Sequence, residues 1–554
     1  MGNRKTVNTQ VKGNAFSVSF ERWVLHPFLF SLFPILLLFT HNIDEVEPVA
    51  ILRSVLVSLI VTVLLFALFR LIFRDSRKAA LLASTVVIIN FSYGRVMDFL
   101  KPYTIAGINL GRHRVVVLLA VIVILLVVAF CLWNKKAIRP VNAFLNFAAL
   151  LAIVFPLVQC ARYLGSVIQE KAVEDNIEVK RVYSDLLTGS SSAQKPETMP
   201  DVYYIILDSY PRADVLYSQM QVDNTEFISE LKKRGFYVAE CSRSNYATTA
   251  QSLASSLNSQ FVQDFEKITD SALDNPQTMS LFVNHNQVTD ILRQLGYKIY
   301  AIESGEGLSE MHSADVYLNF STTPGWYLLG GINPFESMLL NSTTGRYFFD
   351  YYPHRNKNLR MMLDYPYMLH RERILFEFNK VEELAKKPTP KFVFAHILAP
   401  HDPFVFNAEG GLVIRTTPFT LNHDLEYLDE DDYIAGYQGE MAYLNQRILA
   451  MIDAVLENST TRPVIILQGD HGLPTWLSSP EMRMAILNAF LVPEAVPAQL
   501  YSGITPVNTF RVLFDALFAM DFPLKEDIVY YSNYDETHVT YRIVQDSYAE
   551  CQTP

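Results

Sequence analysis

The sequence predicts an α-helical membrane bundle followed by an α/β domain with a mainly parallel sheet. Three observations support this fold class. The chain has 554 residues, too many for one ordinary domain. Half of these residues are hydrophobic, and long apolar runs concentrate them before residue 166. After Pro200, short β-branched and aromatic runs alternate with helix-like segments instead.

Five apolar stretches lie in residues 1–165, each near the ~20 residues that a membrane-spanning helix needs. They cover roughly residues 24–40, 49–69, 79–95, 115–133 and 142–161. The second and fourth have no polar face, which a buried helix of a soluble protein would show. The third is shorter and is the weakest of the five. No small-residue cleavage site follows the first, so it is not a cleavable signal peptide. We expect five spanning helices.

Basic residues in the loops predict the orientation of this bundle. They precede the first stretch and follow the second and fourth, whereas the loop after the first, HNIDEVEP, is acidic. This pattern places the N-terminus in the cytoplasm and, with five spans, the C-terminal domain outside it. Lys101, Arg112 and Arg114 disagree, because their loop would lie outside. If the third stretch did not span the membrane, the number of spans would be even, and the C-terminal domain would lie in the cytoplasm.

Residues 166–199 predict a juxtamembrane helix and then a flexible linker, since they are charged at first and then polar (LLTGSSSAQKPETMP). Residues 200–554 have the composition of a soluble domain. Its predicted strands are residues 202–207, 235–240, 297–303, 391–398 and 464–468. Strands that alternate with amphipathic helices predict a mainly parallel sheet.

Polar side chains follow three of the predicted strands. Asp208 follows the first, His396 and His401 lie at the end of KFVFAHILAPH, and Asp470 and His471 follow the last. Ligands bind at the carboxyl ends of parallel strands. A lone Asp there is usually a turn former or a helix cap, but three such ends favour a site. Two carboxylates and one imidazole suit Zn²⁺ or Mn²⁺ better than Ca²⁺, and leave a coordination position open.

The segment Ser244–Asn258 (SNYATTAQSLASSLN) supplies a candidate nucleophile. Thr248 and Thr249 stand where a polar turn gives way to a helix-like run. A hydroxyl at a helix N-terminus beside a divalent metal has a lowered pKa. The alternative role is a helix N-cap, the commonest task of threonine there. The residues alone leave both roles open.

The motifs VYYIILDS, Thr-x-x-Ser, HILAPHDPF and QGDHG, in this order, resemble the sulfatase and alkaline phosphatase superfamily. The most similar pattern is its membrane branch, the lipoteichoic acid synthases and lipid A phosphoethanolamine transferases. The resemblance covers residues 200 to about 520, and the five predicted spans fit this branch. In the branch, serine follows the nucleophilic threonine by three positions. Thr249 with Ser252 satisfies this pattern, and Thr248 does not.

The resemblance implies that one divalent ion, Zn or Mn, is held by Asp208, Thr249, Asp470 and His471. It also implies that His401 contacts the phosphate of the substrate and that His396 has a counterpart in the family. The alternative for each histidine is a structural role. Arg243 and Asn245 flank the nucleophile and are candidates for binding an anionic group, on proximity only. Arg483 is a weaker candidate of the same kind.

Departures from the family narrow the expected chemistry. Sulfatases that use formylglycine carry a Cys-x-Pro-x-Arg type segment and typically paired aspartates, whereas this chain has TAQSLA and Asp208-Ser209. Two-metal relatives carry a further Asp-x-x-x-His pair ahead of the Asp-His, and the segment that ends at His370 (DYPYMLH) has the wrong spacing for it. We therefore expect one metal and phosphoryl chemistry.

The expected protein is a membrane-anchored hydrolase or transferase. Its substrate would be a lipid or a cell-envelope glycan, with Thr249 as nucleophile. The alternatives are a sulfuric-ester hydrolase acting on sulfated glycans and a non-catalytic scaffold or receptor. A net charge of −11 argues against nucleic acid as a partner. Cys241 and Cys551 could pair in an oxidising compartment. The substrate, the oligomeric state and the role of residues 305–365 have no readable pattern.

Overall fold

The computed structural model describes most of the chain, in two compact units. The described residues are 23–43, 46, 48–174, 199–267, 276–320, 331–351, 364–388, 390–413, 419, 428–493, 499–532, 540–546 and 551. The first unit comprises Met1–Ser166 and Pro324–Tyr365, and the second comprises Val167–Thr323 and Pro366–Pro554. Segment 324–365, which lies inside the predicted C-terminal domain, thus clusters with the N-terminal helices.

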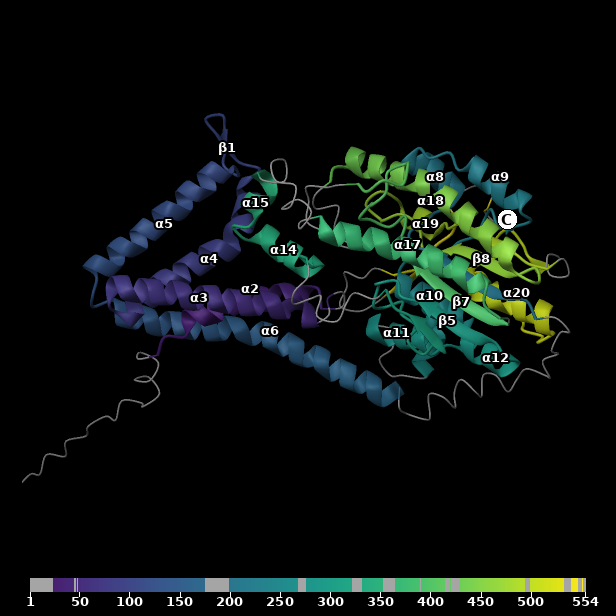
Figure 1. The fold of residues 1–554 in the computed structure, drawn as a ribbon, viewed down its shortest axis with the longest axis horizontal. Helices are drawn as coiled ribbons and strands as arrows, with labels where there is room; N and C mark the ends of the chain where they lie inside the picture. Colours follow the sequence, from purple (N-terminus) through teal and green to yellow (C-terminus); the bar gives the residue numbers. More distant parts are fainter. Residues whose placement is uncertain are drawn as a thin grey trace, which may run out of the picture. The chain divides into compact units, whose positions relative to one another are not determined.

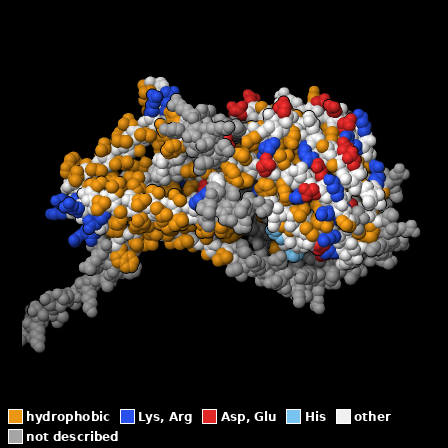
Figure 2. Space-filling view, in the orientation of Figure 1, with side chains coloured by type: hydrophobic (Ala, Val, Ile, Leu, Met, Phe, Trp, Pro, Cys, Tyr) orange, Lys and Arg blue, Asp and Glu red, His pale blue; other side chains and the backbone are white. Residues whose placement is uncertain are grey.

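Apolar helices make up most of the first unit (Figure 1). Those described are α2 (His26–His41), α3 (Leu52–Phe73), α4 (Ser76–Leu100), α5 (His113–Trp133) and α6 (Ile138–Glu174). Hydrophobic side chains cover their surface, whereas charged side chains are spread over the second unit (Figure 2). This distribution is the one expected when lipid surrounds the first unit.

Four of these helical stretches are long and apolar enough to span a membrane: Pro48–Phe73, Ser76–Leu100, His113–Trp133 and Ile138–Gly165. The third predicted span, from the weakest stretch, is a helix of 25 residues. The first is shorter than expected, because α2 has only 16 residues, about 24 Å of helix against ~30 Å of hydrocarbon. Helix α6 continues into the predicted juxtamembrane segment. Residues 1–22 and 175–198 lie outside the described residues, with the first basic cluster and the predicted linker.

Helices α14 (Pro334–Ser342) and α15 (Arg346–Tyr351) belong to the first unit. A capping box starts α14, in which Asn333 and Glu336 each accept a bond from the backbone N–H of the other. The Asn333 amide also donates to the Ala50 carbonyl oxygen at 3.0 Å. Ala50 lies in η1 (Pro48–Ile51), the 3-10 turn that precedes α3. Part of the stretch 305–365, for which the sequence predicted no role, is therefore a component of the first unit.

A mixed seven-stranded sheet forms the centre of the second unit, in the order β4-β9-β8-β3-β7-β5-β6. These strands are β4 (Tyr237–Val238), β9 (Asn488–Leu491), β8 (Val464–Gly469), β3 (Val202–Leu207), β7 (Lys391–Ile397), β5 (Lys298–Ile302) and β6 (Val316–Leu318). The five from β8 to β6 are parallel, while β9 is antiparallel to both of its neighbours. The predicted mainly parallel sheet is confirmed. The predicted strand 235–240 is reduced to a two-residue edge strand.

Side chains of β3 alternate between two hydrophobic cores, as the two-residue period of a strand requires. Tyr203, Ile205 and Leu207 pack on one face against α8 (Ala213–Met220), α9 (Thr225–Lys233), α17 (Tyr365–Ala385) and α18 (Glu430–Asn458). The other face packs against α10 (Thr249–Asn258), α11 (Pro276–Asn284), α12 (Gln287–Leu295) and α20 (Pro506–Phe518). All six residues of β3 are buried, which explains its continuous apolar run.

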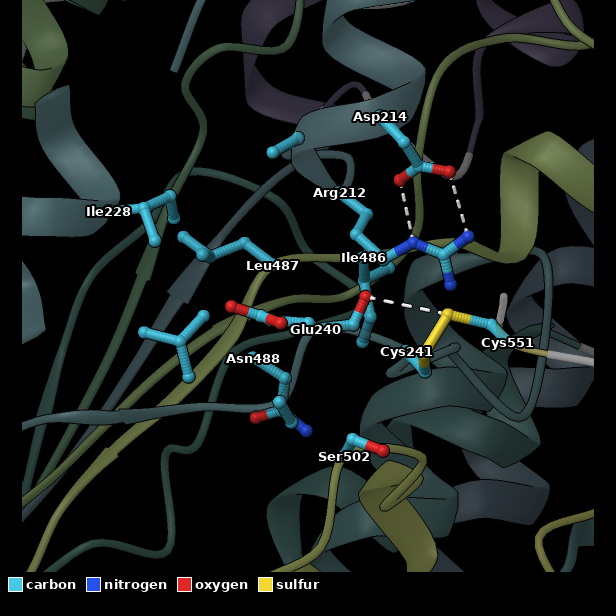
Figure 3. A pocket seen from close by; sticks show the side chains of 13 residues that line it. Arg212, Asp214, Ile228, Glu240, Cys241, Ile486, Leu487, Asn488, Ser502 and Cys551 are labelled. Atoms are coloured by element: carbon cyan, nitrogen blue, oxygen red, sulfur yellow. Dashed lines mark hydrogen bonds and ion pairs between the residues drawn. A yellow bond between two sulfur atoms is a disulfide. The ribbon is translucent and has the colours of Figure 1, made fainter. Parts of the chain in front are cut away.

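A disulfide joins Cys241 to Cys551 across 310 residues, with 5.3 Å between the two Cα atoms. The pairing considered from the sequence is thus confirmed. The bond lies beside a cavity of about 380 Å³, to which Arg212 and Asn488 also contribute (Figure 3). It fixes the end of the chain to the loop that leads into α10.

Candidate functional site

The register of the sheet places the predicted site residues at one edge. Leu207, the last residue of β3, pairs with Ile397 of β7 and with Gly469 of β8. The three strands therefore end level with one another. Asp208 and Asp470, which follow directly after β3 and β8, are thereby brought side by side.

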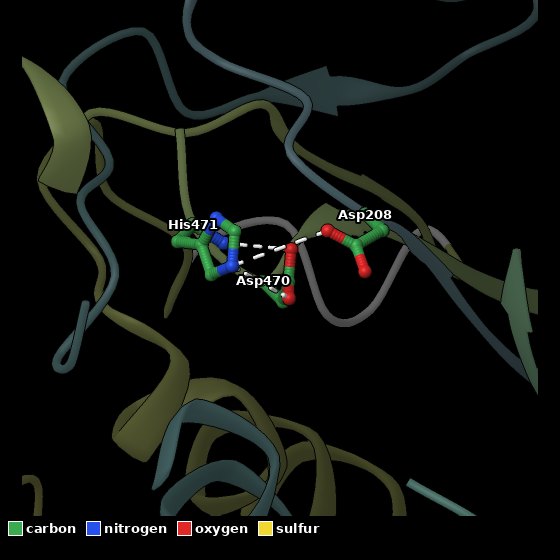
Figure 4. Close-up of side chains that lie close together, drawn as sticks. All are labelled: Asp208, Asp470 and His471. Atoms are coloured by element: carbon green, nitrogen blue, oxygen red, sulfur yellow. Dashed lines mark hydrogen bonds and ion pairs between the residues drawn. The ribbon is translucent and has the colours of Figure 1, made fainter. Parts of the chain in front are cut away.

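Asp208, Asp470 and His471 form a group that can hold a metal ion (Figure 4). One ligand atom from each lies within 4.8 Å of the others, and all three side chains are buried. Oδ1 of Asp208 is buried without a hydrogen-bond partner among the described residues. A buried carboxylate oxygen without a partner is costly, and a cation bound to it removes that cost. This donor set fits one Zn²⁺ or Mn²⁺ ion with a position left open.

Hydrogen bonds orient His471 for this role. Its Nδ1 lies 3.0 Å from the carbonyl oxygen of Gly472, which can only accept. The proton is therefore assigned to Nδ1, and Nε2 keeps its lone pair. Nε2 lies 3.5 Å from Oδ2 of Asp470 and 4.0 Å from Oδ1 of Asp208. The imidazole thus presents an unprotonated nitrogen to both carboxylates.

Thr249 is the threonine that faces this group. It is the first residue of α10, and its hydroxyl donates to Oδ2 of Asp470 at 2.7 Å and lies 3.3 Å from Nε2 of His471. Thr248 holds the N-cap position, with extended backbone, and its hydroxyl contacts Oε1 of Gln251 instead. The N-cap position therefore belongs to Thr248, and the role of Thr249 as nucleophile stays a prediction.

The loop around Asp470 is held by backbone donors and by one strained residue. Oδ1 of Asp470 accepts from the backbone N–H of Ser209 at 3.0 Å and of His471 at 2.8 Å. Ser209 has φ 58°, a left-handed conformation that a side chain disfavours. Ser252 fixes the loop from below, since its hydroxyl donates to the Asp470 carbonyl oxygen at 2.8 Å.

His396 and His401 lie near Asp208. Nε2 of His396 is 3.5 Å from Oδ2 of Asp208, and its Nδ1 is 2.7 Å from the hydroxyl of Ser309. Nδ1 of His401 donates to the Asp402 carbonyl oxygen at 2.6 Å. The His401 side chain is 22% exposed and that of His396 is fully buried, so His401 is the one that a substrate can reach.

The charges of these groups shift the pKa values of their neighbours. Burial alone would raise the pKa of Asp208, but the charge of His401 and a hydrogen bond from His396 hold that pKa below its usual range. Burial works to lower the pKa of His401, yet the carboxylates of Asp208 and Asp402 raise it to about 9. Burial and the charge of Arg483 lower the pKa of His471, which favours the neutral imidazole that metal binding requires.

Arg243 and Asn245 are not brought to this group. Nη1 of Arg243 donates to the Val544 carbonyl oxygen at 3.1 Å, and its Nε lies 3.6 Å from Asp546. The Asn245 amide donates to the Ile528 carbonyl oxygen at 2.8 Å. Both side chains thus hold the C-terminal segment, and a contact with substrate remains a prediction for them.

Arg483, the weaker candidate, lies between the two loops of the site. Its Nε donates to the Ala247 carbonyl oxygen at 2.9 Å, and its Nη1 donates to that of Leu473 at 3.0 Å. Ala247 lies two residues before Thr249, and Leu473 lies two residues after His471. The sequence contains a signal for this arginine only in its position after QGDHG. Ser209 carried no such signal, because nothing in the sequence marks a left-handed serine.

Residues 200–481 match the family model described as Sulfatase, which is just over half of the 554-residue chain. The chain belongs to the sulfatase family, within the alkaline phosphatase superfamily, and has an N-terminal bundle of apolar helices. The motif resemblance is therefore confirmed at the level of the family. Among curated proteins, the comparison found no match.

Solved structures include distant relatives of this fold. The C-terminal periplasmic domain of EptC from Escherichia coli, in complex with Zn, is 12% identical, with a TM-score of 0.39 over 64% of this chain and 94% of that one. The integral membrane lipooligosaccharide phosphoethanolamine transferase A from Neisseria meningitidis is 15% identical, with a TM-score of 0.35 over 89% of this chain and 95% of that one. Similarity at this level does not identify a reaction.

Proposed function

We propose that the chain is a membrane-anchored enzyme that transfers or hydrolyses a phosphoryl group, with Thr249 as nucleophile. The observation that carries this proposal is the position of the Thr249 hydroxyl. It is half-buried at the N-terminus of α10, 2.7 Å from Oδ2 of Asp470 and 3.3 Å from Nε2 of His471. A helix N-terminus stabilises a developing negative charge on such an oxygen.

Asp208, Thr249, Asp470 and His471 would hold one Zn or Mn ion, which when bound lowers the pKa of the hydroxyl and neutralises phosphoryl oxygens. Oδ2 of Asp470 accepts the hydrogen bond of the hydroxyl before attack. The Thr249 hydroxyl gives its proton to Oδ2 of Asp470 as its oxygen bonds to phosphorus. The bond from phosphorus to the leaving oxygen breaks, and that oxygen takes up a proton to leave as the alcohol. An acceptor hydroxyl or water then displaces Thr249. His401 binds the charged oxygens, and His396, with its Nε2 3.5 Å from Oδ2 of Asp208, is the second candidate for this contact.

The substrate class follows from the membrane unit. Helices of spanning length favour a substrate that is itself held at the membrane, a lipid donor or a cell-envelope glycan acceptor. The basic loops favour an extracytoplasmic catalytic domain. The disulfide between Cys241 and Cys551 supports the same side, because disulfides persist in oxidising compartments.

Hydrolysis of sulfuric esters is the second candidate, favoured by the family to which residues 200–481 belong. The nucleophile segment weakens it, because this segment contains threonine where formylglycine sulfatases carry cysteine. A scaffold without catalysis is disfavoured by the convergence of the four proposed metal ligands.

The test is to trap the covalent adduct. The full-length protein is incubated with a panel of phosphate and sulfate esters, quenched in acid and digested for mass spectrometry. A phosphorylated peptide containing Thr249 is expected, and it should vanish in Thr249→Ala but persist in the matched control Thr248→Ala. Full activity of Thr249→Ala would reject the proposal. Release of sulfate without phosphate would favour the second candidate.

A further inference from the structure

We infer that the N-terminal unit binds one membrane phospholipid, with an acyl chain lying in a groove between α3, α4 and α14. The groove has a volume of about 710 Å³ and lies entirely within this unit. Its polar end is formed by Arg53 and Glu336. The inference makes no use of the chemistry of Thr249, so the two can be tested separately.

The length of the groove matches one leaflet of a bilayer. Arg53, Val57, Val61 and Leu65 all line it, and their spacing of four residues places them on one face of α3. From Arg53 to Leu65, at ~1.5 Å per residue, the face extends about 18 Å. One leaflet is half of the ~30 Å hydrocarbon core, about 15 Å. A chain that enters beside Arg53 therefore reaches the middle of the membrane.

The walls of the groove are apolar. Val57 and Val61 are 53% and 48% exposed, and Val87 and Phe91 of α4 line the groove as well. The hydroxyls of Ser58 and Thr62 also face it, but they donate to the carbonyl oxygens of Ser31 and Ser58. These hydroxyls thus need no bond from an occupant. Water would be poorly accommodated here, whereas a hydrocarbon chain fills such a space without cost.

The polar end carries opposite charges side by side. Nε of Arg53 donates to Oε1 of Glu336 at 2.5 Å, and its Nη2 donates to the other carboxylate oxygen and to the Gly331 carbonyl oxygen. Arg53 is the second residue of α3, where a long cationic side chain reaches the interface. A zwitterionic headgroup complements this pair, with its phosphate near the guanidinium and its ammonium group near the carboxylate.

The exposed tyrosines of α15 support a position of the polar end of the groove at the level of the lipid headgroups. Tyr347 and Tyr351 are 38% and 47% exposed, and Phe348 lines the groove. Tyrosine is enriched at the level of lipid headgroups. Helices α14 and α15 are therefore suited to the membrane–water interface. The groove extends from these helices into the hydrocarbon layer.

Photo-crosslinking in a bilayer tests the site. The full-length protein is reconstituted into phosphatidylcholine vesicles that contain a phosphatidylcholine with a diazirine in one acyl chain. After irradiation, labelled peptides are expected from the groove face of α3 and from residues 331–345. Val61→Trp, which fills the groove, should lower this labelling roughly fivefold. The matched control Leu64→Trp, at a 63% exposed position of the same helix that does not line the groove, should leave it unchanged.

Arg53→Gln is a second variant that leaves the groove open. It should abolish the preference for phosphatidylcholine over phosphatidylglycerol when both compete as probes. Equal labelling of every exposed face of α3, or equal losses in Val61→Trp and Leu64→Trp, would overturn the inference. Thr249→Ala should label like the unaltered protein, so a failure of the proposed chemistry remains distinguishable from a failure of the lipid site.

Discussion

Asp546 and Arg212 form a buried ion pair, with 2.8 Å between Oδ2 and Nη1 and 334 residues between them in the chain. Arg212 follows Asp208 by four residues, so this pair ties the C-terminal segment to the loop that carries Asp208. The amide of Gln251, two residues after Thr249, donates a 3.0 Å hydrogen bond to the hydroxyl of Tyr541. The end of the chain is thus a structural support of the site.

Asp546→Asn should destabilise the protein. Breaking a buried pair costs ~3–5 kcal/mol, and the loss here should be smaller because Arg212 keeps its second partner, Asp214. The control is Asp453→Asn, which removes a similar partner from Arg234. Its carboxylate is 47% exposed, so the expected cost is about 0–1 kcal/mol. Chemical denaturation of both variants measures the difference, and equal losses would contradict the support role.

Cys551→Ser should lower the free energy of unfolding by about 2–5 kcal/mol, the usual effect of removing a native disulfide. Thermal unfolding is the measurement. Adding a reductant should bring the unaltered protein to the level of the variant, and the variant itself should not respond. Cys160→Ser is the control, because Cys160 is a free thiol. A reductant effect that persists in Cys551→Ser would point to another cause.

One divalent ion per chain should copurify with the protein, as measured by elemental analysis. Asp208→Asn and Asp470→Asn should each reduce this content well below stoichiometric, since each removes one of three ligands from the group. A chelator should abolish activity, and Zn or Mn should restore it. Asp223→Asn, at an exposed acidic residue outside the site, should keep the full metal content. Two ions per chain would contradict the single-metal site.

Glu377→Gln should stabilise the protein at neutral pH. Glu377 is fully buried, and both of its carboxylate oxygens lack a hydrogen-bond partner among the described residues. Burial and then the charge of Glu310 raise its pKa well above 4.5. Because the folded pKa exceeds the unfolded one, folding holds a proton that the unfolded chain releases, and stability falls as the pH rises above the unfolded value.

The advantage of Glu377→Gln should therefore be absent below about pH 4 and grow as the pH rises above that, until the folded carboxyl ionises. Denaturation at a series of pH values measures it. Glu383→Gln, at a 57% exposed residue of the same helix, is the matched control. A constant difference across the pH series would mean that the carboxyl is not buried in its protonated form.

The grouping of Asp208, Asp470 and His471 was predictable because Asp208 and Asp470 stand directly after strands and His471 follows Asp470. Once the apolar runs 202–207 and 464–468 are taken as parallel neighbours, Asp208 and Asp470 must lie at one edge. Thr249 needed the family pattern, since the position after a cap looks the same in any helix. Ser209 could not be found, because its role depends on a backbone angle.

The place of residues 334–351 in the first unit could not be predicted from the sequence, for a different reason. Residues 334–351 form two short helices, and their placement with the membrane unit depends on contacts such as Arg53 with Glu336, which are 283 residues apart. A local pattern contains no information about such a partner. The weakest apolar stretch was also underestimated, because polar residues such as Ser84 and Asn90 interrupt its hydropathy although Ser84 is buried within the unit.

The chain passes from one unit to the other after Ser166, Thr323 and Tyr365. Because the chain passes between the units three times, the second unit cannot be produced alone by a single truncation. A fragment that begins at Pro200 would carry α14 without the helices that cover it, and Phe335 and Leu339, which are 1% and 9% exposed in the whole protein, would face solvent. Removing residues 324–365 and joining the flanking segments by a linker is therefore the better design for a soluble fragment.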